Sequence, residues 1–327
     1  MTTLLDVKNL KTHFFTNKKV IPAVDGVDIN IHKGETVALV GESGSGKSIT
    51  SLSIMRLVPS PPGEIVDGSI FFDGTDLATL PEEEMYRIRG NDISMIFQEP
   101  MTSLNPVLTI GEQITEVLIY HKKLSKKEAA RKAIDLLKMV GFSRPKEMLD
   151  DYPHRLSGGM RQRVMIAIAM SCNPKLLIAD EPTTALDVTI QAQILDLMKD
   201  LSKQFHTSIL LITHDLGVVS EIADKVLVMY CGQVVEEAQV DDLFNEPLHP
   251  YTVGLMNSIP SIDDDAERLV AIQGNVPSPE HYPKGCRFAS RCPHAFDRCL
   301  QEVPGLLTVE SSRSVRCFLY AKEEARS

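Results

Sequence analysis

Residues 41–48 decide the fold class of this chain, and they read Gly41-Glu42-Ser43-Gly44-Ser45-Gly46-Lys47-Ser48. The apolar, β-branched run at residues 36–40 predicts a strand before this stretch, and the helical spacing of residues 49–57 predicts a helix after it. In this setting the pattern predicts a phosphate-binding loop, because its glycines let backbone N–H groups face phosphate oxygens. Lys47 then reaches the β- and γ-phosphates and Ser48 binds Mg²⁺; the alternative is a plain Gly/Ser turn before a helix.

The alternation of strand and helix continues along the chain. Short apolar runs at residues 176–179 and 209–212 are typical of central parallel strands. Ser125 and Glu128 form a capping-box pattern ahead of a helix predicted over residues 129–140. Together these segments predict an α/β fold with a parallel sheet.

Length and charge limit the possible functions. With 327 residues the chain is long for one ordinary domain, so we expect a large domain followed by a smaller one. Its 34 basic and 44 acidic residues give a net charge of −10, which argues against a nucleic-acid partner. No apolar run approaches the roughly 18 residues of a membrane span, and the first residues lack a secretory pattern. We therefore expect a cytosolic chain whose six cysteines are reduced, catalytic or metal-bound.

Two carboxylates follow the strand predicted at residues 176–179. Asp180 is suited to organise a Mg²⁺ ion, and Glu181 to act as the general base on an attacking water. Taken alone, two exposed acids at a strand end are the simpler interpretation, but a phosphate loop in the same chain favours a catalytic pair. His214 follows the strand predicted at residues 209–213, where it is either a surface residue or a contact to the γ-phosphate.

Further motifs complete a family pattern. Gln98 ends the strand predicted at residues 93–97, and three motifs come later in this order: Leu156-Ser157-Gly158-Gly159-Met160, Asp180-Glu181 and Ala185-Leu186-Asp187. With the phosphate loop and His214, the order resembles the nucleotide-binding subunits of ATP-binding cassette (ABC) transporters over about residues 4–240. The resemblance implies an α/β P-loop NTPase cassette with a parallel-sheet core, an antiparallel β subdomain, an α-helical subdomain and, here, a small C-terminal extension.

The resemblance also implies an ATPase that uses ATP and Mg²⁺, with a role for each matching residue. Nucleotide contacts would come from Phe14 at the adenine, from Gly41, Ser43, Gly44, Ser45, Gly46, Lys47 and Ser48 in the phosphate loop, and from Ser157, Gly158, Gly159 and Asp187 toward the partner subunit. The Mg²⁺ ion would contact Ser48, Gln98 and Asp180. Catalysis would fall to Glu181 as base, His214 as switch, and to Lys47 and Gln98.

The Ser157-Gly158-Gly159 stretch precedes a helix predicted over residues 160–170, and such a helix start is an anion site. In the family this site completes the nucleotide pocket of the other subunit, so the resemblance implies a dimer with ATP between its subunits. A flexible helix start is the alternative. Met160 stands where the family more often has Gln, and we expect a weakened side-chain contact without loss of function.

Residues 95–106 and Pro247-Leu248-His249-Pro250-Tyr251-Thr252 resemble the oligopeptide and dipeptide importers. That subgroup implies a subunit that energises peptide import at the cytoplasmic face of the cell membrane. Its partners would be a second ABC ATPase, two transmembrane permeases and, indirectly, an extracytoplasmic peptide-binding protein. The alternatives are an importer for nickel or another small solute and a soluble ABC ATPase outside transport. We expect the ATPase domain at residues 1–245, its helical subdomain at about residues 99–175, and the extension at residues 246–327.

Four of the six cysteines lie late in the sequence, with gaps of 5, 6 and 17 residues: Cys286, Cys292, Cys299 and Cys317. Four thiolates suffice for a [4Fe–4S] cluster or for Zn²⁺, and the gaps are longer than those of zinc knuckles. The importer resemblance implies the iron–sulfur cluster, and four reduced structural thiols are the third interpretation. Cys172 and Cys231 lie among apolar residues, so we expect them in the core.

Overall fold

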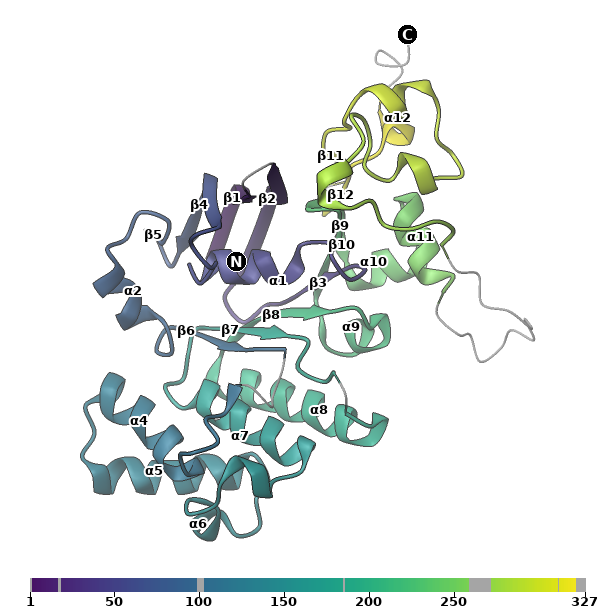
Figure 1. Cartoon of the computed structure of the whole chain (residues 1–327). Helices are drawn as coiled ribbons and strands as arrows, with labels where there is room; N and C mark the ends of the chain where they lie inside the picture. The colour runs from purple at the N-terminus through teal and green to yellow at the C-terminus, as the bar shows by residue number, and fades with distance from the viewer. Residues whose placement is uncertain are drawn as a thin grey trace. The chain divides into compact units, whose positions relative to one another are not determined.

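The structure, a computed structural model, describes residues 2–16, 19–98, 103–184, 186–258, 272–310 and 312–321 (Figure 1). The chain forms two compact units. The first comprises Met1–Leu4, Ile31–Thr36 and Thr79–Ile212, and the second comprises Leu5–Asn30, Val37–Ala78 and Thr213–Ser327. The phosphate loop therefore belongs to the second unit, and Asp180 and Glu181 belong to the first.

Three parallel strands form the sheet of the first unit. β6 (Ile93–Ile96) pairs with β7 (Leu176–Asp180), which pairs in turn with β8 (Ser208–Thr213). Every residue of β7 and β8 is buried, and a parallel strand that is buried on both faces requires apolar side chains on both. The apolar runs at residues 176–179 and 209–212 are confirmed as neighbouring parallel strands.

Helices make up most of the rest of the first unit (Figure 1). They are α2 (Glu82–Ile88), α4 (Ile110–Lys122), α5 (Lys126–Met139), α6 (Pro145–Met148), the short turn η1 (Pro153–Arg155), α7 (Gly158–Met170) and α8 (Val188–Phe205). Helix α7 contacts β6, α4, α5 and α8, so it is central to the packing. The capping box predicted for α5 is confirmed, since Ser125 and Glu128 each bond the backbone N–H of the other.

In the second unit, the first strands of the chain form an antiparallel sheet in the order β2-β1-β4-β5. These strands are β1 (Thr3–Phe15), β2 (Val20–His32), β4 (Gly63–Phe72) and β5 (Thr75–Asp76). Strand β1 pairs with β4 from Leu5 opposite Phe72 to Phe14 opposite Gly63. An antiparallel β subdomain is thereby confirmed.

The second unit also contains strands from distant parts of the sequence. β3 (Thr36–Val40) pairs in parallel with β9 (Lys225–Tyr230), and β9 forms an antiparallel hairpin with β10 (Gln233–Gln239). Two short strands then extend this sheet, because β12 (Arg313–Val315) pairs with β10 and β11 (Leu307–Glu310) pairs with β12. The late part of the chain is therefore built onto the sheet that carries the phosphate loop.

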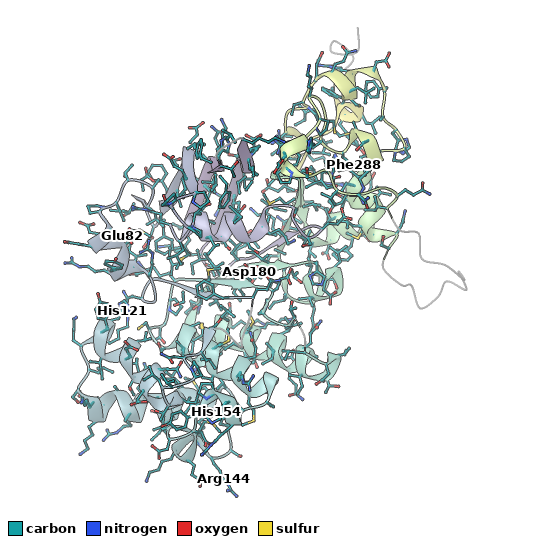
Figure 2. The ribbon with its side chains drawn as sticks, viewed as in Figure 1. Glu82, His121, Arg144, His154, Asp180 and Phe288 are labelled. Carbon is teal, nitrogen blue, oxygen red and sulfur yellow. The ribbon has the colours of Figure 1, made fainter. Side chains whose placement is uncertain are left out.

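The remaining elements of the second unit are short helices and turns. They are α1 (Lys47–Ile54), α9 (Leu216–Ile222), α10 (Val240–Asn245), α11 (Pro250–Met256), η2 (Pro279–His281), η3 (Ala289–Arg291), α12 (Asp297–Gln301) and η4 (Phe318–Tyr320). The buried side chains of Tyr251 and Phe288 pack in one core with Val228 and Tyr230 of β9; Figure 2 labels Phe288. Within the described ranges, no helix combines the length and apolar character that a membrane crossing requires.

Candidate functional site

Glycines let the phosphate loop run against neighbouring backbone. A Cβ atom at Gly41 would overlap the carbonyl oxygen of Met229, and one at Gly46 would lie 2.5 Å from the carbonyl oxygen of Ala23. Gly46 is the N-cap of α1 and has a φ of +103°, a backbone conformation that residues other than glycine rarely adopt. The two glycines therefore fix the path of the loop into the helix.

Lys47 is the first residue of α1, and its ammonium group lies inside the loop. Its Nζ atom donates to the carbonyl oxygens of Gly41 at 2.7 Å and Glu42 at 3.1 Å. The backbone carbonyl of Ser45 in turn accepts a hydrogen bond from the N–H of Gly232 at 2.7 Å. The loop is a turn closed around its own lysine, which suits it to bind phosphate oxygens.

In the first unit, two of the predicted site residues are in direct contact. The Gln98 amide donates to the Glu181 carboxylate at 3.0 Å, and the hydroxyl of Thr184 donates to the same carboxylate at 2.9 Å. Glu181 has a φ of +47°, an uncommon backbone conformation for a residue with a long side chain. Asp180, labelled in Figure 2, is the last residue of β7 and is 3% exposed. The strand end thus presents one buried and one partly exposed carboxylate.

The Ser157-Gly158-Gly159 motif forms the start of α7. The Ser157 hydroxyl is the N-cap and accepts the N–H of Met160 at 3.3 Å. Gly158 and Gly159 already lie in the first helical turn, so the helix begins two residues before the predicted residue 160. The reason is the serine cap, whose oxygen satisfies one of the free N–H groups at the helix end. Asp187 caps α8 in the same way, accepting the N–H of Ile190 at 2.9 Å.

The other predicted nucleotide residues lie at the ends of strands. Phe14 is near the end of β1, opposite Gly63 of β4. His214 follows β8 directly and precedes Asp215, the N-cap of α9. Parts of two predicted motifs, Glu99-Pro100-Met101-Thr102 and Ala185, lie outside the described residues.

The Pro247-to-Thr252 motif reaches the phosphate loop through Tyr251. The fully buried carboxylate of Glu236 accepts the N–H groups of Leu248 at 2.7 Å and His249 at 2.8 Å, and burial raises its pKa. The Nδ1 atom of His249 accepts the N–H of Tyr251 at 3.0 Å and caps α11. The Tyr251 hydroxyl accepts the N–H of Glu42 at 2.8 Å. The sequence contains no local signal for this contact, because 209 residues separate the two partners.

Two regions of the chain match known families. Residues 24–184 match the ABC transporter family, and residues 235–299 match the C-terminal region of oligopeptide/dipeptide transporters. The oligopeptide transport ATP-binding protein AppD of Bacillus subtilis (strain 168) is 71% identical over 325 residues, which make up 99% of each chain. The chain belongs to the ABC transporter ATPases.

Two further comparisons agree with this family. OppD of Bacillus subtilis (strain 168), also an oligopeptide transport ATP-binding protein, is 52% identical over 320 residues, covering 98% of this chain and 89% of that one. Among solved structures, a dimeric ATP-binding cassette in a post-hydrolysis state with ADP and Pi has a TM-score of 0.65 and 30% identity, covering 72% of this chain and 99% of that one. The predicted fold class, an ABC cassette of the P-loop type, is therefore confirmed, and the chain is an ABC ATPase.

The C-terminal region of this ABC ATPase brings its four late cysteines to one small cavity, which His249, Phe288 and Phe318 also line: Cys286, Cys292, Cys299 and Cys317. Burial raises the pKa of the Cys286 and Cys292 thiols, and raises that of Cys317 to about 11. Among the described residues, no group of three or more His, Cys, Asp or Glu side chains is arranged to hold a metal ion. The described residues therefore do not show the expected iron–sulfur or zinc site, and a metal bound here would have to displace the protons of these thiols.

The other two cysteines of the ABC ATPase behave as predicted. Cys172 is 1% exposed and Cys231 is 0% exposed. Burial raises the pKa of both thiols, that of Cys231 to about 11. The prediction that these two are core residues is confirmed.

His249 makes the stability of the ABC ATPase depend on pH. Burial lowers its pKa to about 3, against about 6.5 in an unfolded chain. Between these values only the unfolded chain binds the proton, so the free energy of unfolding falls as the pH is lowered. From pH 7 to pH 5 this single group should cost about 2 kcal/mol. Chemical denaturation at both pH values should show this loss in the wild type.

His249→Asn is the variant that isolates this effect, because an Asn oxygen can still cap α11 but does not titrate. We expect its loss of stability between pH 7 and pH 5 to be smaller than that of the wild type by about 2 kcal/mol. His154→Asn, at an exposed position labelled in Figure 2, is the control and should keep the wild-type slope. Equal slopes for the wild type and His249→Asn would contradict the assignment.

Proposed function

We propose that this ABC ATPase energises the import of oligopeptides or dipeptides through a membrane permease complex. The observation that carries the proposal is the match of residues 235–299 to the C-terminal region of oligopeptide/dipeptide transporters. The 71% identity to an oligopeptide transport ATP-binding protein along both whole chains supports it. The ATPase domain is assigned to residues 1–245, with a helical subdomain at about residues 99–175, and the importer-specific extension to residues 246–327.

The nucleotide chemistry follows from the motifs. Lys47 exchanges its bonds to the loop carbonyls for oxygens of the β- and γ-phosphates, and the loop residues from Gly41 to Ser48 hold the phosphates. Phe14 stacks on the adenine. Ser48, Gln98 and Asp180 would hold Mg²⁺, which would supply positive charge to the phosphates.

Glu181 accepts the proton of the attacking water. Its carboxylate is oriented by the Gln98 amide at 3.0 Å and the Thr184 hydroxyl at 2.9 Å. A base held by two donors has one preferred direction, and this favours attack in line with the leaving group. His214 contacts the γ-phosphate and reports its loss.

The ATPase acts as a dimer, most simply a heterodimer with a second ABC ATPase. The N-terminus of α7, with Ser157, Gly158 and Gly159, has free N–H groups and a positive dipole end, and Ser157 and Gly158 are exposed. It binds the γ-phosphate held by the partner subunit. Asp187 completes the contact between the subunits.

The substitution Glu181→Gln tests the role of the base. We expect turnover to fall by at least about 100-fold while ATP binding persists, because the amide keeps the shape but cannot accept the proton. Size-exclusion chromatography with MgATP should show a trapped dimer. Glu83→Gln, at an exposed position of α2, should retain wild-type turnover. Normal hydrolysis by Glu181→Gln would remove Glu181 as the base.

The import function predicts peripheral association with the cytoplasmic face of the membrane. Purification of the tagged chain from detergent-solubilised membranes should bring down two permeases and a second ATPase. Vesicles containing this complex should take up a labelled oligopeptide when ATP is supplied, and Glu181→Gln should abolish uptake. Uptake of nickel ions without peptide uptake would reassign the cargo. A chain that brings down no membrane partner would contradict a transport function.

We also propose that Cys286, Cys292, Cys299 and Cys317 take up an iron–sulfur cluster. The support is that four cysteines from separate segments line a single cavity, and that the chain resembles the peptide importers. Because burial raises the pKa of the Cys286, Cys292 and Cys317 thiols, the cluster iron would have to displace their protons. A bound cluster would cross-link a segment built from short helices, short strands and turns, which offer little packing of their own.

Anaerobic purification tests this proposal. We expect brown protein with a broad absorbance band near the blue end of the visible range, and we expect it to contain iron and acid-labile sulfide. Cys292→Ser should lower both contents, whereas Cys172→Ser, at a buried position in the first unit, should leave them unchanged. Colourless protein without iron and sulfide would contradict the cluster and favour four structural thiols.

A further inference from the structure

Glu42, the second residue of the phosphate loop, is bound through both its side chain and its backbone by the C-terminal segment, which is the described part of residues 246–327. The Arg291 guanidinium donates to the two carboxylate oxygens of Glu42 at 2.7 Å and 3.1 Å. The hydroxyl of Tyr251 accepts the Glu42 backbone N–H at 2.8 Å. Glu42 is therefore a point at which the C-terminal segment is attached to the phosphate loop.

Arg291 is itself fixed in place. Its side chain is 3% exposed, and that of Glu42 is 30% exposed. The guanidinium also donates to the backbone carbonyl of Gln273 at 3.1 Å and to the Tyr230 hydroxyl at 3.3 Å. A two-pronged, charge-assisted bond from a buried and otherwise bonded arginine is both strong and directional. Removing the Glu42 carboxylate would leave the buried guanidinium without its charged partner.

The peptide carbonyl of Glu42 faces the opposite way, into the loop. It accepts bonds from the Lys47 ammonium at 3.1 Å and from the Ser45 N–H at 3.2 Å. The N–H and carboxylate of Glu42 thus bind the C-terminal segment, and its carbonyl binds the two residues that shape the phosphate cradle. A shift of Glu42 would therefore disturb its bonds to both Lys47 and Ser45.

We propose that Arg291 and Tyr251 are positioning residues of the ATPase: they hold Glu42 so that Lys47 and the loop amides are aimed at the ATP phosphates. Both residues act through Glu42. Because the two residues act on the geometry of the loop, removing either one should weaken the binding of the ground state and of the transition state equally. The C-terminal segment then contributes to ATP affinity directly, apart from any role in transport.

The test is a double-mutant cycle in the full-length chain. Arg291→Met and Glu42→Gln should each raise the Kd for MgATP, and the KM of hydrolysis, roughly fivefold to tenfold, with kcat within about twofold of the wild type. The double variant should bind no more weakly than the weaker single variant, because both act through one contact. Tyr251→Phe, which removes one oxygen atom, should raise Kd roughly threefold.

The matched control is an ion pair that also involves the C-terminal segment but does not touch the loop. Lys19 and Glu280 form it at 2.9 Å, and both side chains are about half exposed. Lys19→Met and Glu280→Gln should leave Kd unchanged. If Arg291→Met fails to fold, Glu42→Gln and Tyr251→Phe decide the question.

The proposal is overturned if the folded Glu42→Gln and Tyr251→Phe variants bind MgATP within twofold of the wild type. It is equally overturned if the effects of Arg291→Met and Glu42→Gln multiply, since independent effects would mean that the contact does not act as a unit. Only ATP binding and hydrolysis are measured, so a failure here is distinct from a failure of the peptide-import function.

Discussion

The close approach of the phosphate loop to neighbouring backbone is the constraint on which the second unit depends. Gly41 has no room for a side chain beside the Met229 carbonyl, and Gly46 has almost none beside the Ala23 carbonyl. The loop can therefore form only when β9 and β2, which carry these carbonyls, are already in place. A phosphate-binding turn is often described as a local motif. Here its shape depends on a residue about 190 positions later in the chain, as the Gly41–Met229 approach shows.

The phosphate loop also depends on the C-terminal segment. Strand β12 adds to the edge of β10, and the buried Glu236 of β10 holds the backbone of His249. A buried carboxylate is costly unless its oxygens are bonded, so these bonds specify one arrangement of the chain between β10 and α11. That arrangement places the Tyr251 hydroxyl at the Glu42 N–H. The segment therefore packs as part of the second unit and belongs to its hydrogen-bond network.

The sequence was informative wherever the signal is local. The capping box of α5, the apolar strands β7 and β8 and the turn into α1 each depend on residues within a few positions of one another. The short strands β11 and β12 could not be predicted, because they are stabilised by pairing with β10 rather than by periodicity. In the site, Gln98 and Glu181 were each predicted as functional residues from their own motifs. Their hydrogen bond could not be predicted, because it follows from the pairing of β6 with β7. The four late cysteines were grouped by the sequence, and the structure adds that they line one cavity.

Because β12 lies near the end of the sequence, its pairing with β10 can form only late in the synthesis of the chain. The phosphate loop leaves the ribosome early, whereas Tyr251, Arg291 and β12 follow only after about 200 to 270 further residues. N-terminal parts of a chain fold first during synthesis, so the nascent loop must wait in an unfinished state for its last supports. A growing chain would then be unable to bind ATP with full affinity until translation is nearly complete. Such a delay would keep half-made subunits from capturing a partner through bound nucleotide.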